Sequence, residues 1–184
     1  ALKKYKRIHA DHVNQQWQID LIDYRDLNVK WVLSVIDVYS RKGAFTKVGT
    51  KKSKLVLEAF KHISNEYFGG KLPDRITCDD GSEFKKEFAE YLAENNITVY
   101  VAPRDVSENH GHKNATGIVE RFNGTFRIKS RYYKEEHKLR TLQESDLKKI
   151  TDKYNDTPHS TLTGDTPNQI YNGKIPSYKT RKYN

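Results

Sequence analysis

The sequence predicts an α/β fold, in which a mixed five-stranded sheet is flanked by helices on both faces. The first observation is that three apolar segments open the chain, the first two joined by a polar turn, which favours antiparallel strands. The second is that amphipathic segments then alternate with two further short apolar segments. This alternation favours parallel strands connected by helices.

The five predicted strands are short apolar runs bounded by residues that favour turns. The turn between the first two contains Arg25, Asp26 and Asn28, and Pro73 precedes the fourth strand. The strands are expected at residues 16–24, 31–37, 44–48, 75–78 and 98–101. Three antiparallel strands therefore come before two that we expect to be parallel.

Two helices are predicted in the first half of the chain, where apolar residues recur at helical spacing. Ser53 is expected to be the N-cap of the first helix, and Gly69 and Gly70 are expected to end it. The second covers residues 84–92 and stops at the following asparagine pair. Each helix would bury one apolar stripe.

The second half of the chain is predicted to be mostly helical. A long polar loop over residues 102–117 leads into a helix at residues 117–134, and another helix covers residues 142–154. Thr166 followed by Pro167 is the pattern of an N-cap and a first helical residue, so a short helix is expected there.

One domain of ordinary size accounts for most of the 184 residues. Residues 1–15 are expected to form a basic N-terminal arm or linker, and residues 174–184 a basic tail or linker. Residues 16–173 are expected to form the folded core with a C-terminal helical extension. Because the chain starts at Ala1 and contains no methionine, we expect it to be a fragment of a longer protein.

The charge balance indicates a polyanionic partner. Lys and Arg number 33 against 24 Asp and Glu, a formal net charge of +9. The alternative is a basic domain without such a partner. Cys78 is the only cysteine, which excludes an intramolecular disulfide and favours a reducing compartment. No apolar run approaches the roughly 18 residues of a membrane span, so no membrane contact is expected.

Three acidic residues lie at informative places in the predicted elements. Asp20 is inside the first strand, Asp79 follows the fourth strand, and Glu120 begins the long helix. Buried carboxylates need a partner, and oxygen ligands of this kind suit Mg²⁺ or Mn²⁺. Each acid also has an ordinary alternative: a hydrogen-bonded aspartate, a turn, and an anion that complements the helix dipole. Asp23 would face the opposite side of the sheet from Asp20.

The surroundings of these acids resemble the catalytic cores of retroviral-type integrases, the DD-E recombinases with an RNase H-like fold. The resemblance rests on WQID at residues 17–20, DDGSEF at 79–84 and GIVERFN at 117–123. IDVYSR at residues 36–41 fits as well. YNDTPHS at 154–160 and the later Thr166-Pro167 resemble integrases of LTR retrotransposons and of Polinton (Maverick) elements.

The resemblance implies that Asp20, Asp79 and Glu120 are the catalytic and metal-binding triad. Two features depart from the family pattern. The interval between Asp79 and Glu120 is longer than usual, with the extra length in the loop, and Asp80 stands where relatives often have asparagine. Glu108 is a rival third acid, but no amphipathic helix follows it.

The implied activity is DNA integration. Two Mg²⁺ (or Mn²⁺) ions would promote in-line attack on phosphodiesters, first by water near the 3′ end of the element DNA. The freed 3′-OH would then attack target DNA. The alternatives are a nuclease of the same fold that only hydrolyses, and a domesticated DNA-binding protein without catalysis. Integrases act on DNA in the nucleus or another intracellular compartment, and generally as homodimers or larger assemblies.

DNA contacts are expected along the helix that starts near Glu120 and in the loop before it. Lys and Arg outnumber Glu between residues 121 and 140, which favours phosphate binding, although a solvated helix face has the same pattern. Asn123 is expected to orient a phosphate or a water on the metal. The expected DNA-binding residues are Lys113, Asn114, Thr116, Arg121, Asn123, Arg127 and Arg131.

Overall fold

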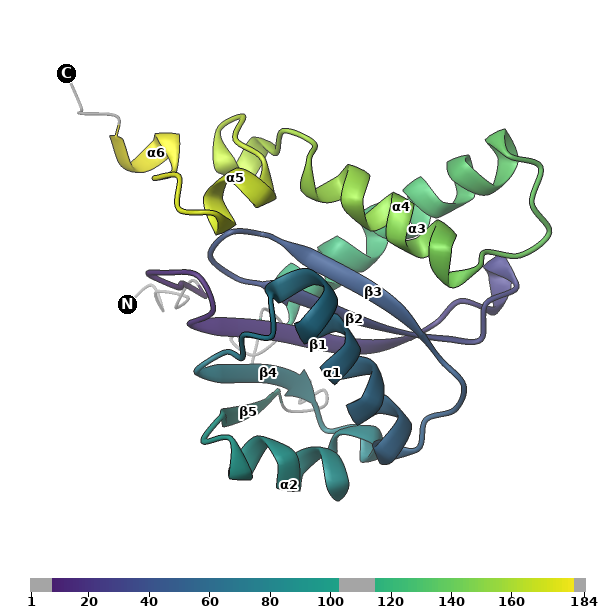
Figure 1. Ribbon diagram of the computed structural model, residues 1–184, viewed down its shortest axis with the longest axis horizontal. Coiled ribbons are helices and arrows are strands. Elements are labelled where there is room, and N and C mark those ends of the chain that lie inside the picture. The colour runs from purple at the N-terminus through teal and green to yellow at the C-terminus, as the bar shows by residue number, and fades with distance from the viewer. Residues whose placement is uncertain (1–7, 103–114, 181–184) are drawn as a thin grey trace, which may run out of the picture.

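The computed structural model describes residues 8–102 and 115–180, and it contains a five-stranded sheet in the order β3-β2-β1-β4-β5 (Figure 1). The strands are β1 (Gln16–Asp23), β2 (Trp31–Asp37), β3 (Gly43–Val48), β4 (Arg75–Asp79) and β5 (Thr98–Ala102). Strand β2 pairs antiparallel with β1 and β3, whereas β4 pairs parallel with β1 and β5. The predicted mixed sheet is therefore confirmed.

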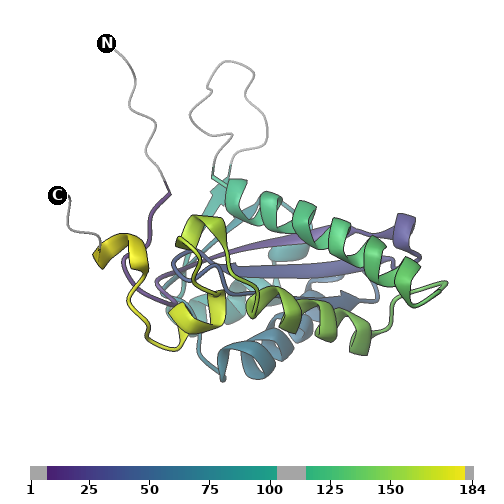
Figure 2. The same cartoon turned by 90° about the horizontal axis from the view of Figure 1, so that it is seen from above.

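Helices cover both faces of the sheet, as predicted. One face carries α1 (Ser53–Phe68) and α2 (Glu87–Glu94), and the other carries α3 (Gly117–Glu136) and α4 (Glu144–Asn155) (Figure 2). Two short helices follow, α5 (Pro167–Tyr171) and α6 (Ser177–Thr180). Among the described residues, no helix has both the length and the apolar character to cross a membrane.

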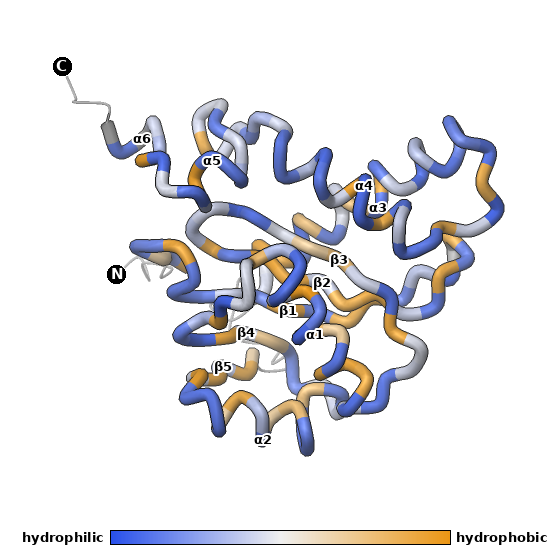
Figure 3. Tube along the Cα trace, viewed as in Figure 1, coloured by the Kyte–Doolittle hydropathy of each residue, from blue (hydrophilic) through white to orange (hydrophobic). Residues whose placement is uncertain are grey.

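Each face of the sheet has its own hydrophobic core. Side chains alternate between the two faces along a strand, and β2 shows this clearly. Leu33 and Val35 pack on the α1 side, whereas Val32 and Ile36 pack on the α3 side. Hydrophobic residues accordingly concentrate in the central strands, while much of the C-terminal half is hydrophilic (Figure 3). The central strands are therefore buried on both faces, whereas Val99, Tyr100 and Val101 of β5 are exposed.

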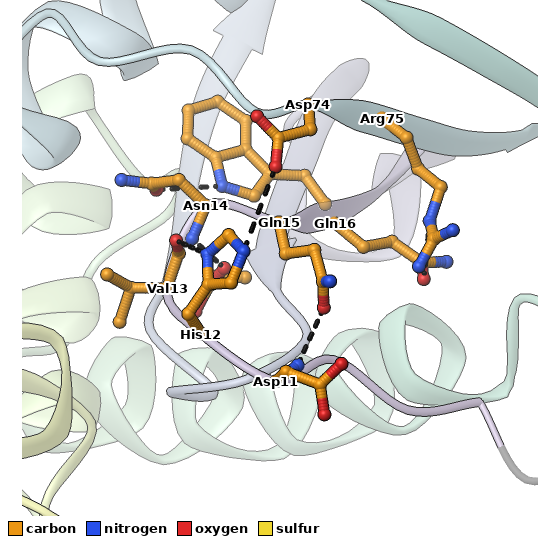
Figure 4. A network of polar contacts seen from close by, with 10 residues as sticks. Asp11, His12, Val13, Asn14, Gln15, Gln16, Asp74 and Arg75 are labelled. Carbon is orange, nitrogen blue, oxygen red and sulfur yellow. Dashed lines mark hydrogen bonds and ion pairs between the residues drawn. The ribbon is translucent and has the colours of Figure 1, made fainter.

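The segment just before β1 is tied to the sheet by polar contacts (Figure 4). The backbone N–H of Asn14 donates to the buried carboxylate of Asp37 at 2.9 Å, and the Trp17 ring N–H donates to Asn14 Oδ1 at 3.1 Å. Asn14 Nδ2 also donates to the Tyr171 hydroxyl of α5 at 3.0 Å. Residues near Asn14 therefore pack against the core. The predicted boundary between an arm at residues 1–15 and the core stays a prediction.

The predicted N-cap of α1 is wrong. Lys52 occupies the N-cap position, and Ser53 is the first residue of the helix. The Ser53 hydroxyl donates to the backbone carbonyl of Lys85 and accepts the backbone N–H of Phe88. The serine therefore connects α1 to the start of α2, a tertiary contact that local sequence does not reveal.

Two other predicted helix boundaries are confirmed. Gly69 ends α1 in the left-handed region at φ +65°, where glycine has no steric penalty. The Thr166 side chain accepts the backbone N–H of Gln169, and Pro167 is the first residue of α5. Local capping chemistry was sufficient to predict both of these boundaries.

Candidate active site

Asp20 and Asp79 occupy neighbouring positions on adjacent parallel strands. Gln18 of β1 pairs with Thr77 of β4, so Asp20 and Asp79, each two residues further on, continue the same row. Residues two apart on a strand share a face, and both carboxylates therefore project from the same side of the sheet. The topology brings together two of the three predicted acids.

Asp20 faces the side of the sheet that α3 covers. Asn123 of α3 donates from Nδ2 to Asp20 Oδ2 at 2.8 Å. Glu120, one turn earlier, is exposed, and its Oε1 accepts the Thr116 hydroxyl at 2.6 Å. Within the described residues, no three His, Cys, Asp or Glu side chains are arranged to hold a metal ion. Glu120 thus lies on the same side as the aspartates but is turned toward Thr116.

The charges of the other two acids act on Asp20. The pKa of Asp20 is raised to about 6, mainly by burial, then by the negative charge of Asp79 and, less strongly, by that of Glu120. Hydrogen bonds from the Leu21 backbone and the Asn123 side chain partly oppose this rise in pKa. Like charges act in this way only across a short range or a poorly solvated region. The carboxylates therefore face a common region of negative potential.

At Gly81, in the turn after Asp79, a side chain would crowd two carboxylate groups. Its φ of −71° is open to any residue, but a Cβ there would lie 2.9 Å from Asp79 Oδ1. The same Cβ would lie 2.8 Å from Oε2 of Glu83, which is buried beside Lys51 with their charged atoms 3.9 Å apart. Glu83 is a fourth carboxylate at this end of β4, and the sequence reasoning missed it although it stands in the quoted motif.

The first turn of α3 is held by Gln18 of β1, another residue that the sequence reasoning missed. Its side chain is fully buried, and its Oε1 accepts the backbone N–H groups of Ile118 and Val119 at 3.1 and 2.9 Å. Its Nε2 donates to the carbonyl of Ala115 at 2.8 Å. The only sequence signal was the position of Gln18 two residues before Asp20.

The other acids considered from sequence have different surroundings. Asp23 accepts Arg25 Nε at 2.8 Å in an exposed ion pair at the end of β1. Asp80 pairs with Lys85 at 2.8 Å between their charged atoms, so its carboxylate has a cationic partner of its own. Glu108 lies outside the described residues.

The arginines predicted to bind DNA differ in how they are placed on α3. Arg121 and Arg131 are exposed, and Arg121 Nε donates to the Gly117 carbonyl at 3.1 Å. Arg127 is half-buried; it donates to the Asp23 carbonyl at 3.2 Å and lies 4.5 Å from the centroid of the Tyr24 ring. Arg127 therefore also connects α3 to the end of β1.

The remaining residues predicted to bind DNA are Asn123, Thr116, Lys113 and Asn114. Asn123 is buried against Asp20, and its side-chain oxygen has no hydrogen-bond partner among the described residues. Thr116 is half-buried, with its hydroxyl engaged by Glu120. Lys113 and Asn114 lie outside the described residues.

Known proteins resemble this chain in sequence and fold. The family described as the integrase core domain matches residues 10–105. The HTLV-2 integrase catalytic core domain, solved with magnesium in a trimeric form, is 22% identical with a TM-score of 0.69; the match covers 87% of this chain and 97% of that one. No curated protein matches the sequence.

Two further solved structures show the same fold. The simian T-cell lymphotropic virus intasome in complex with PP2A regulatory subunit B56 gamma is 19% identical with a TM-score of 0.72; the match covers 98% of this chain and 65% of that one. The BIV integrase catalytic core domain is 16% identical with a TM-score of 0.64, covering 86% and 93%. The likeness shows the RNase H-like integrase core fold.

Proposed function

We propose that this chain, which belongs to the integrase core domain family, cuts and joins DNA with Asp20, Asp79 and Glu120 as its catalytic residues. The observation that carries the proposal is the placement of Asp20 and Asp79 side by side on adjacent parallel strands, facing the helix that carries Glu120; the raised pKa of Asp20 is consistent with this placement. A folded protein keeps such an unfavourable cluster where function requires it.

The residues fit a divalent metal in chemistry. All three donors are carboxylates, which Mg²⁺ and Mn²⁺ prefer, and a cation would relieve the repulsion on Asp20. Glu120 would join Asp20 and Asp79 after leaving its hydrogen bond to Thr116. Two bound ions would activate the attacking oxygen and stabilise the leaving oxygen. HTLV-2 integrase cores have been solved in complex with magnesium, which supports this choice.

The protein's own residues would orient the reaction. Asn123 donates to one oxygen of Asp20 at 2.8 Å, and the Leu21 backbone also donates to this carboxylate, so both contacts would orient Asp20 toward a ligand. The buried oxygen of Asn123, without a partner among the described residues, would accept a hydrogen bond from an ordered water or from substrate. Water would attack near the 3′ end of element DNA, and the freed 3′-OH would then attack target DNA, with no covalent protein intermediate.

Basic residues on α3 would bind the DNA backbone. Arg121 and Arg131 are exposed on the helix that carries Glu120 in its first turn, so a DNA strand at the acidic site would pass beside them. Arg127 would mainly hold α3 against the end of β1, through its contacts with Asp23 and Tyr24. Contacts from Lys113, Asn114 and Thr116 remain part of the proposal.

Self-association is also proposed. HTLV-2 integrase cores have been solved in dimeric and trimeric forms, and the simian T-cell lymphotropic virus protein in an intasome. A homodimer or larger assembly of this chain would place two acidic sites on paired DNA ends. Action on chromosomal DNA would require the nucleus or another intracellular compartment that contains DNA.

A strand-transfer assay tests the proposed function. The protein is incubated with Mg²⁺ or Mn²⁺, a labelled oligonucleotide with a pre-cut end, and a target plasmid. Joined products are expected from the wild type and not from Asp20→Asn. Asp23→Asn is a matched control, because Asp23 lies on the same strand but pairs with Arg25 at the surface.

The products distinguish the possible activities. Joined DNA that depends on Asp20 supports an integrase, whereas cleavage without joining indicates a nuclease. DNA binding with neither product, in the longer protein that supplies any flanking domains, would contradict catalysis altogether. Equal loss of activity in Asp20→Asn and Asp23→Asn would contradict the assignment of the site.

A further inference from the structure

We propose that Gln18 is a positioning residue, which fixes the helix carrying Glu120 against the strand carrying Asp20. This inference rests on the proposed function, because it concerns the spacing of two proposed metal ligands. Gln18 and Asp20 lie two residues apart on one face of β1, and Val119, which Gln18 binds, directly precedes Glu120. One side chain therefore links the immediate neighbourhoods of both acids.

The hydrogen bonds of Gln18 are of the kind that fixes a position. The side chain is fully buried, so its amide does not exchange these bonds for water. It accepts two backbone N–H groups of the first turn of α3 and donates to the carbonyl of Ala115 just before the helix. Three bonds from one planar amide fix both the position and the rotation of this turn.

Helix α3 has no cap of its own that would do the same. The first N–H groups of a helix lack partners within it, and a side chain at the N-cap usually supplies them. Thr116 occupies the N-cap position without a side-chain capping bond, and its hydroxyl donates to Glu120 instead. The capping hydrogen bonds therefore come from Gln18, which lies on β1 and a hundred positions earlier in the sequence.

This arrangement makes the spacing of the acids depend on Gln18. A helix capped by its own N-cap residue would keep its cap if it shifted over the sheet. Here any such movement breaks bonds to β1 itself. Residues that orient metal ligands in this way typically change metal affinity or activity by about 10- to 100-fold when replaced.

Gln16 provides a matched control. It lies on the same strand and the same face, is also buried, and its amide also makes two side-chain contacts. Those contacts are with Thr77 at 2.8 Å and Arg75 at 3.1 Å, so they stay within the sheet and do not reach α3. Replacing Gln16 therefore removes buried amide bonds without releasing Glu120.

The test compares Gln18→Met with Gln16→Met, because methionine keeps the volume and flexibility of glutamine but makes no comparable hydrogen bonds. Mn²⁺ binding is measured from the electron paramagnetic resonance signal of free Mn²⁺. Amide hydrogen exchange at Ile118 and Val119 is followed in the same samples. Thermal unfolding shows that each variant is folded under the conditions used.

Gln18→Met is expected to weaken Mn²⁺ binding by roughly tenfold or more and to speed exchange at Ile118 and Val119. Gln16→Met is expected to do neither, even where its melting temperature falls equally. Gln18→Glu keeps the two accepting bonds, and it should restore slow exchange at Val119.

Two results would overturn the inference alone: Mn²⁺ affinity in Gln18→Met equal to that of wild type, or an equal loss in Gln16→Met. Failure of the wild type to bind Mn²⁺, or binding that Asp20→Asn leaves unchanged, would instead overturn the proposed function on which the inference rests. The two failures are thus distinguishable in one set of titrations.

Discussion

The carboxyl group of Asp20 is costly to ionise in the folded protein. Burial and the charges of Asp79 and Glu120 raise its pKa from 3.8 to about 6. The folded state therefore holds the proton of Asp20 more tightly than the unfolded state does. The stability that this protonation contributes is fully present below about pH 4, and it is lost as the pH rises through 6.

Asp20→Asn should accordingly stabilise the metal-free protein at high pH. At pH 8 its free energy of unfolding should exceed that of wild type by on the order of 2 kcal/mol, and the difference should shrink toward zero at pH 4. Urea unfolding of both proteins across this pH range measures the effect. A difference that does not depend on pH would mean that the asparagine acts through packing and not through charge.

Glu83 is a residue of the candidate site that sequence reasoning missed. Its motif is visible, but its burial beside Lys51 and its closeness to Asp79 depend on the turn at Gly81. Asp20, Asp79 and Glu120 could be singled out from the sequence because each lies on a predicted strand or at a helix start, and their assignment as a triad stays a proposal. The position of Glu83 could not be predicted, because it depends on how the chain turns after β4, which the sequence pattern does not reveal.

At the scale of elements, α4 is joined to the sheet through Asn155. Its Oδ1 accepts the backbone N–H of Gly43 at 3.0 Å, and its Nδ2 donates to the carbonyl of the same residue at 2.8 Å. The side chain thus pairs with β3 as a further strand residue would. This gives a structural role to the YNDTPHS segment, which the sequence associated with a family only by resemblance.

Asn155→Ala is expected to lower the free energy of unfolding by about 2–4 kcal/mol, because it leaves both polar groups of Gly43 buried without partners. Asn95→Ala, at the exposed end of α2, is the control and should cost less than about 1 kcal/mol. Chemical denaturation measures both. Similar losses in the two variants would show that the pairing with Gly43 contributes little.

The elements were largely predictable, whereas the contacts between them were not. Strand and helix periodicity places every major element, and local capping residues such as Gly69 and Thr166 fix ends correctly. The contacts of Ser53 and Gln18 could not be predicted from the sequence, for one physical reason. Each side chain accepts a backbone N–H at the start of a helix that lies on a distant segment of the chain. The local sequence pattern therefore gives no sign of what either residue binds.

At the scale of the molecule, positive charge and the acidic site meet along α3. The net charge of +9 favours a polyanion in general, but the proposal requires that phosphates contact this helix in particular. Arg121 and Arg131 are exposed there, on the face of the sheet opposite α1. Binding should then depend on the position of the basic residues and not on net charge alone.

Salt dependence separates these possibilities. Arg121→Ala and Arg131→Ala should each weaken DNA binding and reduce the slope of log affinity against log salt by about 1. Lys54→Ala, an exposed cation on α1, removes the same charge from the opposite face and should leave the slope nearly unchanged. Fluorescence anisotropy over a range of salt concentrations gives the slopes. Equal slopes in all three variants would argue for binding by net charge.

Asp20, Asp79 and Glu120 are proposed to form one metal site. Its most direct test is a crystal structure of the protein with Mn²⁺, with anomalous scattering measured to locate the ions. The account predicts an anomalous peak bound by Asp20 and Asp79, with Glu120 turned away from Thr116 toward the metal. Saturating Mn²⁺ with no peak at these residues, or a peak elsewhere that leaves both aspartates without metal, would contradict it.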